Sequence, residues 1–320
     1  MMLQKTLLYC CLWLLFCASQ IQAATRLVVL PVDALEVVRL LGGMAQVVGV
    51  SQHAAERSAL LPEAAKIPGV GKGFSPNLEA IAALGPDVVV TWKGYPGPEL
   101  ERRLEPFGIR VLRLDMHLPE NLTWGVHALA ELLGEKAVAR GKDYLNWVRQ
   151  AEARLHASIP AGVAQPAVLA EHFAPDRLAG PGSALFELTL KAGGRNPASR
   201  LHTASSPVNM EWVVEQHPDV VIKSVSLSSL DTQKGLEQLK KARAELSARI
   251  GWQDVPAARD GRIYAISADI LGGPRWVVGM AALVEAFYPE AACKTNAQAL
   301  HKEYLHLFQE DSAGGALAVP

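Results

Sequence analysis

One sequence pattern occurs twice in the chain and decides its fold: PNLE at 76–79 with GPDVVV at 85–90, then VNME at 208–211 with HPDVVI at 217–222. The Asn, Glu, Pro and Asp of the second copy each follow those of the first by 132 positions, as in 209 − 77. In each copy Asn is a good N-cap, Glu two residues later suits the helix dipole, and Pro-Asp leads from a helix into a buried strand. The repeat therefore predicts two lobes built on one supersecondary plan.

Strands and helices alternate around the first copy. Hydrophobic spacing predicts strands at 26–30, 46–50, 87–91 and 110–114, and helices at 34–41, 77–84 and 98–106. This alternation is typical of a parallel sheet covered by helices on both faces.

The pattern changes after residue 121. A helix that ends at 133 is followed by 135–160, a charged and amphipathic stretch with no Pro or Gly between Gly141 and Pro160, which we interpret as one long connecting helix. Strands expected at 167–170, 220–223 and 262–266 then form a second lobe. The predicted fold is α/β: two Rossmann-like lobes with central parallel sheets, 24–134 and 161–320, joined by the long helix 135–160.

The first 23 residues have the pattern of a cleaved secretory signal peptide. Lys5 supplies the positive start, 7–18 the apolar run and Ile21-Gln22-Ala23 the small-residue cleavage site. A retained membrane anchor is the alternative, although the apolar run is short for a span of about 20 residues. A lipid-modified Cys17 is a further alternative, which the bulky Phe16 before it disfavours. We expect a freely soluble periplasmic protein.

Composition limits the class of protein. A chain of 320 residues, half of them apolar, is long enough for two domains with sizeable cores. Its 31 basic and 32 acidic residues give a formal charge of −1, without the basic excess that nucleic-acid binding requires. Cys293 is the one cysteine after the signal, so no intramolecular disulfide is expected in the mature chain.

Motifs for catalysis or for a protein-held metal are missing from the sequence. Gly69, Gly71 and Gly73 follow Pro68 rather than a strand, so we interpret them as a flexible turn and not a nucleotide loop. Ser183 lacks the nucleophile-elbow spacing, and no His-x-x-x-His, His-Glu-x-x-His or paired-cysteine pattern occurs. We expect no enzyme and no metal site made by protein ligands alone. An exported α/β enzyme or metallochaperone stays open as the alternative, because fold does not imply function.

The paired motifs and the long helix together resemble a known family, the periplasmic binding proteins for iron-siderophores, haem and cobalamin, which are the helical-backbone receptors of ABC importers. The resemblance covers nearly all of the mature chain and also rests on segments at 47–50, 107–111, 192–196, 252–256, 261–264, 273–275 and 288–290. It implies a monomeric substrate-binding protein that captures a metal chelate between its lobes, with no cofactor of its own. The implied partners are an ABC permease and its ATPase, with only peripheral contact with that membrane complex.

The resemblance assigns a docking role to the two glutamates of the repeat. In the family one acidic residue on each lobe docks onto arginines of the permease, and Glu79 and Glu211 occupy those positions here. Carboxylates matched to arginines make charge-assisted and geometrically specific contacts. The alternative is that both glutamates only stabilise the starts of their helices.

Candidate ligand contacts on the first lobe follow the ends of predicted strands, where open parallel sheets bind ligands. Trp92 and Tyr95 offer faces for a macrocycle or a catecholate, and Lys93 offers a cation. The segment from Trp92 to Gly94 looks like the corresponding loop in cobalamin receptors, although Trp92 anchoring a loop is the alternative. Phe74 and His53 are expected at the mouth of the cleft.

Candidates on the second lobe follow the strands at 167–170 and 262–266. His172 and Phe173 follow the first of these strands, and Asp269, Arg275 and Trp276 follow the second. His172 is a candidate metal or hydrogen-bond ligand, with a structural role as the alternative. Arg275 suits an anionic chelate, with a role in holding the local turn as the alternative.

The identity of the ligand stays open between several chelates. The Trp92 loop favours a corrinoid, Arg275 and Lys93 suit an anionic ferric siderophore, and His172 keeps haem or a free-metal chelate in consideration.

Overall fold

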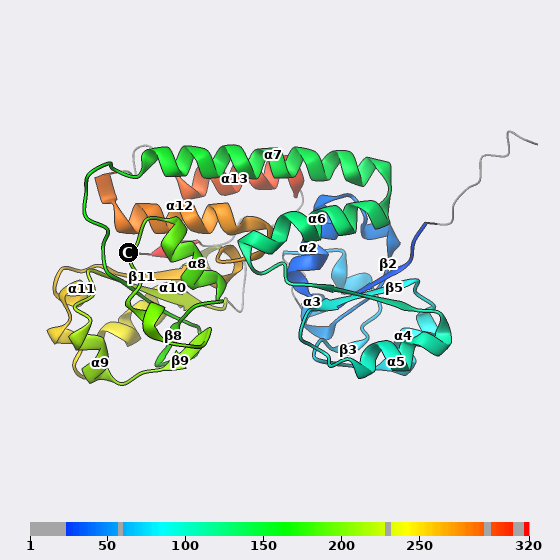
Figure 1. The fold of residues 1–320 in the computed structure, drawn as a ribbon, viewed down its shortest axis with the longest axis horizontal. Coiled ribbons are helices and arrows are strands. Elements are labelled where there is room, and N and C mark those ends of the chain that lie inside the picture. The colour runs from blue at the N-terminus through cyan, green and yellow to red at the C-terminus, as the bar shows by residue number, and fades with distance from the viewer. Residues whose placement is uncertain (1–23, 57–59, 228–231, 291–295, 310–316, 320) are drawn as a thin grey trace, which may run out of the picture.

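The computed structural model describes residues 24–56, 60–227, 232–290, 296–309 and 317–319; the expected signal peptide lies outside them. Two α/β lobes stand side by side beneath one long helix, α7 (Glu135–Ser158), which spans both (Figure 1). The predicted fold class is therefore confirmed. Within the described residues no helix is both long and apolar enough to cross a membrane.

The N-terminal lobe is built on a parallel sheet of four strands in the order β2-β1-β5-β6. Parallel pairing places Leu27 of β1 opposite Val88 of β5, so the valine-rich strand of the sequence repeat lies in the middle of the sheet. The elements are β1 (Leu27–Val29), α2 (Val32–Leu40), β2 (Val47–Val50), α3 (Gln52–Glu56), β3 (Gly71–Lys72), β4 (Ser75–Pro76), α4 (Leu78–Leu84), β5 (Val88–Trp92), α5 (Glu99–Leu104), β6 (Arg110–Leu114) and α6 (Pro119–Leu133).

The C-terminal lobe contains a mixed sheet of six strands in the order β12-β11-β10-β7-β8-β9. Its central strands β7, β10 and β11 are parallel as predicted, whereas β8, β9 and β12 are antiparallel additions at the edges. The elements are β7 (Val168–Glu171), β8 (Arg177–Ala179), α8 (Ala184–Lys191), β9 (Ser205–Pro207), α9 (Met210–Glu215), β10 (Val220–Val225), α10 (Thr232–Ser247), α11 (Pro256–Arg259), β11 (Ile263–Ser267), α12 (Trp276–Phe287), α13 (Ala297–Phe308) and β12 (Ala318–Val319). Short 3-10 turns include Ala268–Ile270 and Gly273–Arg275.

The sequence repeat is also a structural repeat. Asn77 caps α4 by accepting a hydrogen bond from the N–H three residues later, and Asn209 caps α9 in the same way. The two aspartates match as well: Asp87 Oδ2 accepts the N–H of Arg26 just before β1, and Asp219 Oδ2 accepts the N–H of Ala167 just before β7, both at 2.7 Å. Each Pro-Asp therefore ties its central strand to the neighbouring strand of the same lobe.

Helix α7 is amphipathic, and its buried side holds the lobes together. The buried positions recur every three or four residues: Ala137, Gly141, Tyr144, Trp147, Val148, Ala151, Leu155 and Ser158. Helices α12 and α13 lie beside α7 in Figure 1, and one hydrophobic cluster runs from β1 of the first lobe to β7 of the second. This shared core makes α7 a common backbone of both lobes.

Candidate ligand site between the lobes

An aromatic cluster lies at the end of β5 on the N-terminal lobe. Phe74 stacks on Trp92 with ring centroids 4.7 Å apart and meets Tyr95 edge-to-face at 5.7 Å. Phe74 and Tyr95 are about two thirds exposed, at 65% and 63%, while Trp92 is half-buried beneath them. The structure thus brings together three residues that the sequence singled out at separate places, and leaves their faces open to solvent.

Phe74 is presented by a tight hairpin of β3 and β4. The glycine-rich segment interpreted as a turn contains the turn of this hairpin, at Gly73 and Phe74, between two short antiparallel strands that pair Lys72 with Ser75. A Cβ on Gly73 would lie 2.6 Å from the Trp92 ring, so only glycine lets the hairpin pass this close to the indole. The close approach explains why Phe74 lies over Trp92.

Arg113, on β6, fixes the loop that carries Tyr95. Its guanidinium donates to the carbonyls of Trp92 at 3.0 Å, Pro96 at 2.7 Å and Gly97 at 3.0 Å. The same group forms an ion pair with Glu101 at 2.6 Å, and this hydrogen bond lowers the pKa of the Glu101 carboxyl. Sequence reasoning missed Arg113, since its only signal was a second arginine within the strand Arg110–Leu114.

A corresponding loop on the C-terminal lobe carries Phe173. This side chain is 67% exposed and follows β7, as Tyr95 follows β5. Lys223, buried on β10, donates to Glu171 Oε1 at 2.6 Å and to the carbonyls of His172 and Phe173 at 2.5 and 3.3 Å. Each lobe therefore has an exposed aromatic residue on a loop that a basic side chain anchors from below.

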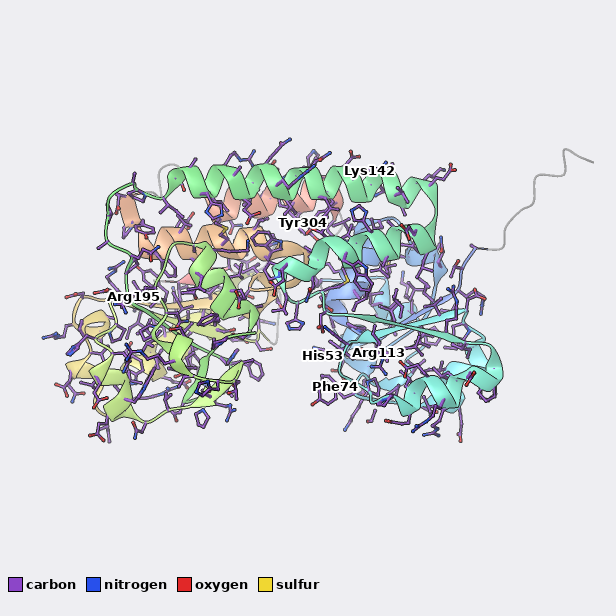
Figure 2. All side chains as sticks on the ribbon, viewed as in Figure 1. His53, Phe74, Arg113, Lys142, Arg195 and Tyr304 are labelled. Atoms are coloured by element: carbon purple, nitrogen blue, oxygen red, sulfur yellow. The ribbon has the colours of Figure 1, made fainter. Side chains whose placement is uncertain are left out.

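Two exposed residues of the N-terminal lobe face the other lobe. In Figure 2, where all described side chains are drawn, Phe74 and His53 lie on the side of their lobe that is turned toward the C-terminal lobe. His53 and Lys93 are exposed beside the aromatic residues. His172 is half-buried, and its Nε2 is 2.9 Å from the carbonyl oxygen of Ala204, a contact that favours the structural alternative for this residue.

The remaining predicted ligand contacts have other surroundings. Arg275 is 4% exposed and forms a buried ion pair with Glu36, Nε to Oε1 at 2.9 Å, so its charge is already neutralised. Trp276 is 3% exposed, with the Lys191 ammonium over its ring at 5.3 Å. Asp269 is half-buried in the 3-10 turn after β11. The structure places Arg275 in a structural role, so we leave it and Trp276 out of the interlobe site.

The Glu36–Arg275 pair belongs to a buried polar tie between the lobes. Tyr304 Oη, from α13, donates to Glu36 Oε1 at 2.9 Å, and Tyr144 Oη, from α7, donates to the carbonyl of Pro274 at 2.7 Å. Burial raises the pKa of both tyrosines, so their hydroxyls stay protonated donors. Helix α2 of the first lobe is thereby joined to α13 and to the 3-10 turn Gly273–Arg275 of the second lobe, and that turn is bonded to α7.

Glu79 and Glu211 occupy equivalent positions on the two lobes. Each is exposed in the first turn of its helix, α4 or α9. Figure 1 shows α4 and α9 on the side of the molecule farthest from α7, one on each lobe. Within the described parts of the chain, no group of three or more His, Cys, Asp or Glu side chains is arranged to hold a metal ion.

A sequence model of the periplasmic binding protein family matches residues 27–270. The chain belongs to this family. The vitamin B12-binding protein of Salmonella typhimurium is 30% identical over 177 residues, which are 55% of this chain and 64% of that protein. The chain therefore aligns with less than two thirds of that relative. The cobalamin-binding protein of Halobacterium salinarum is 27% identical over 271 residues, 82% of this chain and 69% of that protein.

Solved structures agree with the fold. A periplasmic haem-binding protein from Pseudomonas aeruginosa has 28% identity and a TM-score of 0.65, covering 83% of this chain and 93% of that one. The molybdate-bound protein MolA of Haemophilus influenzae has 20% identity and a TM-score of 0.74, covering 90% and 93%, a likeness in fold alone. The Salmonella, Halobacterium and Pseudomonas proteins named above are all binding proteins.

Proposed function

We propose that this periplasmic binding protein captures a planar metal chelate between its lobes for an ABC importer, with a corrinoid as the first candidate. The observation that carries the proposal is the cluster of Phe74, Trp92 and Tyr95 on one lobe, with Phe173 on a matching loop of the other. Aromatic faces bind large flat ligands by dispersion and by apolar burial. The cobalamin-binding relatives favour a corrinoid over haem or a ferric siderophore.

The metal in this proposal is part of the cargo, bound through its chelator. The ring nitrogens of a corrinoid or tetrapyrrole already coordinate the metal ion. The protein then has to provide aromatic walls and a few polar groups. Exposed polar groups near the aromatic cluster include Lys93 and His53, with Lys72 and Ser75 in the hairpin that carries Phe74. Lys93 is expected to meet a carboxylate, amide or phosphate at the edge of the ligand.

The first experiment is a binding screen of the mature protein by tryptophan fluorescence and thermal shift. Cyanocobalamin, haemin, several ferric siderophores and nickel-histidine are compared. A specific ligand is expected to raise the melting temperature by mass action and to quench Trp92. Phe74→Ala should weaken its binding about tenfold or more, because an exposed aromatic face proposed to contact the ligand is removed. Phe107→Ala, at an equally exposed phenylalanine in the 3-10 turn after α5, serves as the control.

The outcome of the screen separates the receptor from its alternatives. Absence of binding across the panel, with the protein folded, or chemical conversion of a ligand would contradict the proposal. In either case the exported enzyme or metallochaperone becomes the better reading.

We also propose that Glu79 and Glu211 dock the protein onto arginines of the permease. Their support is the structural repeat, which puts one exposed carboxylate in the first turn of the equivalent helix of each lobe. The double variant Glu79→Lys/Glu211→Lys should bind ligand normally yet lose import, because both contacts become repulsive. Glu135→Lys is a matched control, since Glu135 also lies in the first turn of a helix and is exposed on α7. Import that survives the double reversal would exclude this docking mode.

A further inference from the structure

The buried carboxylate of Glu171 is shared by two parts of the C-terminal lobe. Glu171 ends β7 and is 3% exposed. On one side its Oε1 accepts Lys223 Nζ at 2.6 Å, and the same ammonium holds the carbonyls of His172 and Phe173. On the other side Arg249 donates to Oε2 at 2.7 Å and to Oε1 at 3.0 Å. One carboxylate therefore binds the base beneath the Phe173 loop and a second base from a distant turn.

Arg249 belongs to a turn that packs against the start of α9. It lies just after α10 and lines a small cavity of about 120 Å³ together with Asn209 and Met210. A Cβ on Gly251 would lie 2.7 Å from Met210 Cγ, so this turn and the first residue of α9 are in close contact. The turn therefore supports the end of the helix that carries Glu211.

Asp176 makes a second connection between Arg249 and α9. Its Oδ1 accepts a hydrogen bond from Arg249 at 3.1 Å, and its carbonyl accepts the N–H of Val208, just before the Asn209 cap, at 3.1 Å. Because Glu171 is buried, the loss or movement of one cation leaves its charge incompletely neutralised and alters its hold on the other cation.

The N-terminal lobe provides an internal comparison. Arg113 anchors the loop that carries Tyr95, and its ion pair is with Glu101 on α5. Glu79 lies on a different helix, α4. The charge pair beneath the loop of this lobe therefore ends away from the helix that is proposed to dock.

We propose that Glu171 couples the ligand loop to the docking helix of the C-terminal lobe. A chelate seated against Phe173 fixes the loop carbonyls that hold Lys223. Glu171 then keeps both cations in place, and Arg249, a positioning residue, orders the start of α9. The coupling rests on the proposed function, since it gives the loaded protein a better-ordered Glu211 than the empty protein has.

Hydrogen–deuterium exchange of the mature protein tests the coupling from each end without a ligand. Lys223→Met removes the contact with the ligand loop, and it should speed the exchange of 209–215, on the docking side, about five- to tenfold. Arg249→Met should in turn speed the exchange of 172–175, the loop after β7, by a similar factor. Lys240→Met, at an exposed position on α10, is the control and should change neither segment.

Two comparisons separate coupling from a general loss of stability. Residues 78–84 of α4 should exchange at the parent rate in both variants, because global destabilisation would speed their exchange as well. Arg249→Lys keeps the charge but loses the two-point contact with Glu171, so it should restore the parent exchange only in part. The Arg249 side chain is 26% exposed, and Arg249→Met keeps the test decisive if Lys223→Met fails to fold.

Cyanocobalamin is the probe for the effect of a ligand. At saturation it should slow the exchange of 209–215 about threefold or more in the parent protein, and it should bind to Arg249→Met without this effect. If cyanocobalamin does not bind, the corrinoid proposal fails, and the exchange of the ligand-free variants still decides the coupling. Exchange that changes only on the mutated side in both variants, or equal slowing by cyanocobalamin in Arg249→Met, would overturn the coupling.

Discussion

At the residue scale, Arg113 shows how one side chain sets the geometry of a loop. It binds three carbonyls of the segment 92–97 and Glu101 at once. Arg113→Met should destabilise the protein by about 1–3 kcal/mol and weaken chelate binding, because buried carbonyls lose their donor and Tyr95 loses its support. Urea unfolding and ligand titration measure the two effects. Arg110→Met, at an exposed position on the same strand, is the control. Unchanged ligand affinity in Arg113→Met would show that the loop 92–97 keeps its conformation without Arg113.

His301 is the residue that should give the fold its acid sensitivity. It is 1% exposed on α13, both ring nitrogens lack partners among the described residues, and burial together with the charge of Arg275 lowers its pKa from 6.5 to about 3. As pH falls, His301 is therefore protonated in the unfolded chain before it is protonated in the folded protein. Its contribution to the free energy of unfolding is fully present above pH 6.5 and is lost as pH falls toward 3.

Replacing His301 tests this linkage. His301→Leu should flatten the fall of unfolding free energy below about pH 6.5 by up to about 1.4 kcal/mol per pH unit, and should be near neutral at pH about 7. Urea unfolding at several pH values gives the slope. His306→Gln, exposed on the same helix, should retain the slope of the parent protein. An unchanged slope in His301→Leu would mean that His301 does not titrate between the folded and unfolded states.

At the element scale, the two asparagine caps should contribute equally. Asn77 and Asn209 accept N–H groups at 3.0 and 2.9 Å at the starts of α4 and α9. Each change to Ala should cost about 1 kcal/mol, and the double variant should show the sum, because the caps lie on different lobes. Denaturant unfolding of the two single variants and the double variant tests this. A loss of unfolding free energy in only one of the two single variants would mean that the two caps have the same geometry but do not stabilise the protein equally.

At the scale of the whole molecule, the Glu36–Arg275 pair should tie the lobes to one another. Both side chains are 4% exposed, so removing one partner leaves a buried charge. Arg275→Met should cost about 3–5 kcal/mol, whereas the double variant Glu36→Met/Arg275→Met should cost much less. Urea unfolding near neutral pH distinguishes them. An equal loss of unfolding free energy in the single and double variants would show that the ion pair contributes no stability beyond the packing of its two side chains.

The sequence by itself determined the elements whose signal is local. The repeat predicted two lobes, with the central strands and their caps, because Asn, Glu and Pro-Asp act within a few residues of where they stand. It also predicted Trp92 and Tyr95 at one place, since both follow the end of the same strand. Phe74 was expected only at the mouth of the cleft, and its stacking on Trp92 came from the tertiary structure. Helix α7 was predicted from its apolar period, which survives in its buried face.

Only the tertiary structure decided which side chains meet across long separations. The sequence predicted Arg275 as a ligand contact, whereas in the structure it is buried against Glu36, 239 residues away. The antiparallel strands β8, β9 and β12 have only two or three residues each, so they lack a period that a sequence can display. Trp276 was expected in the cleft and is instead buried beside α6 and α7. The burial of a side chain and the groups it contacts depend on packing between the lobes, which no local sequence pattern encodes.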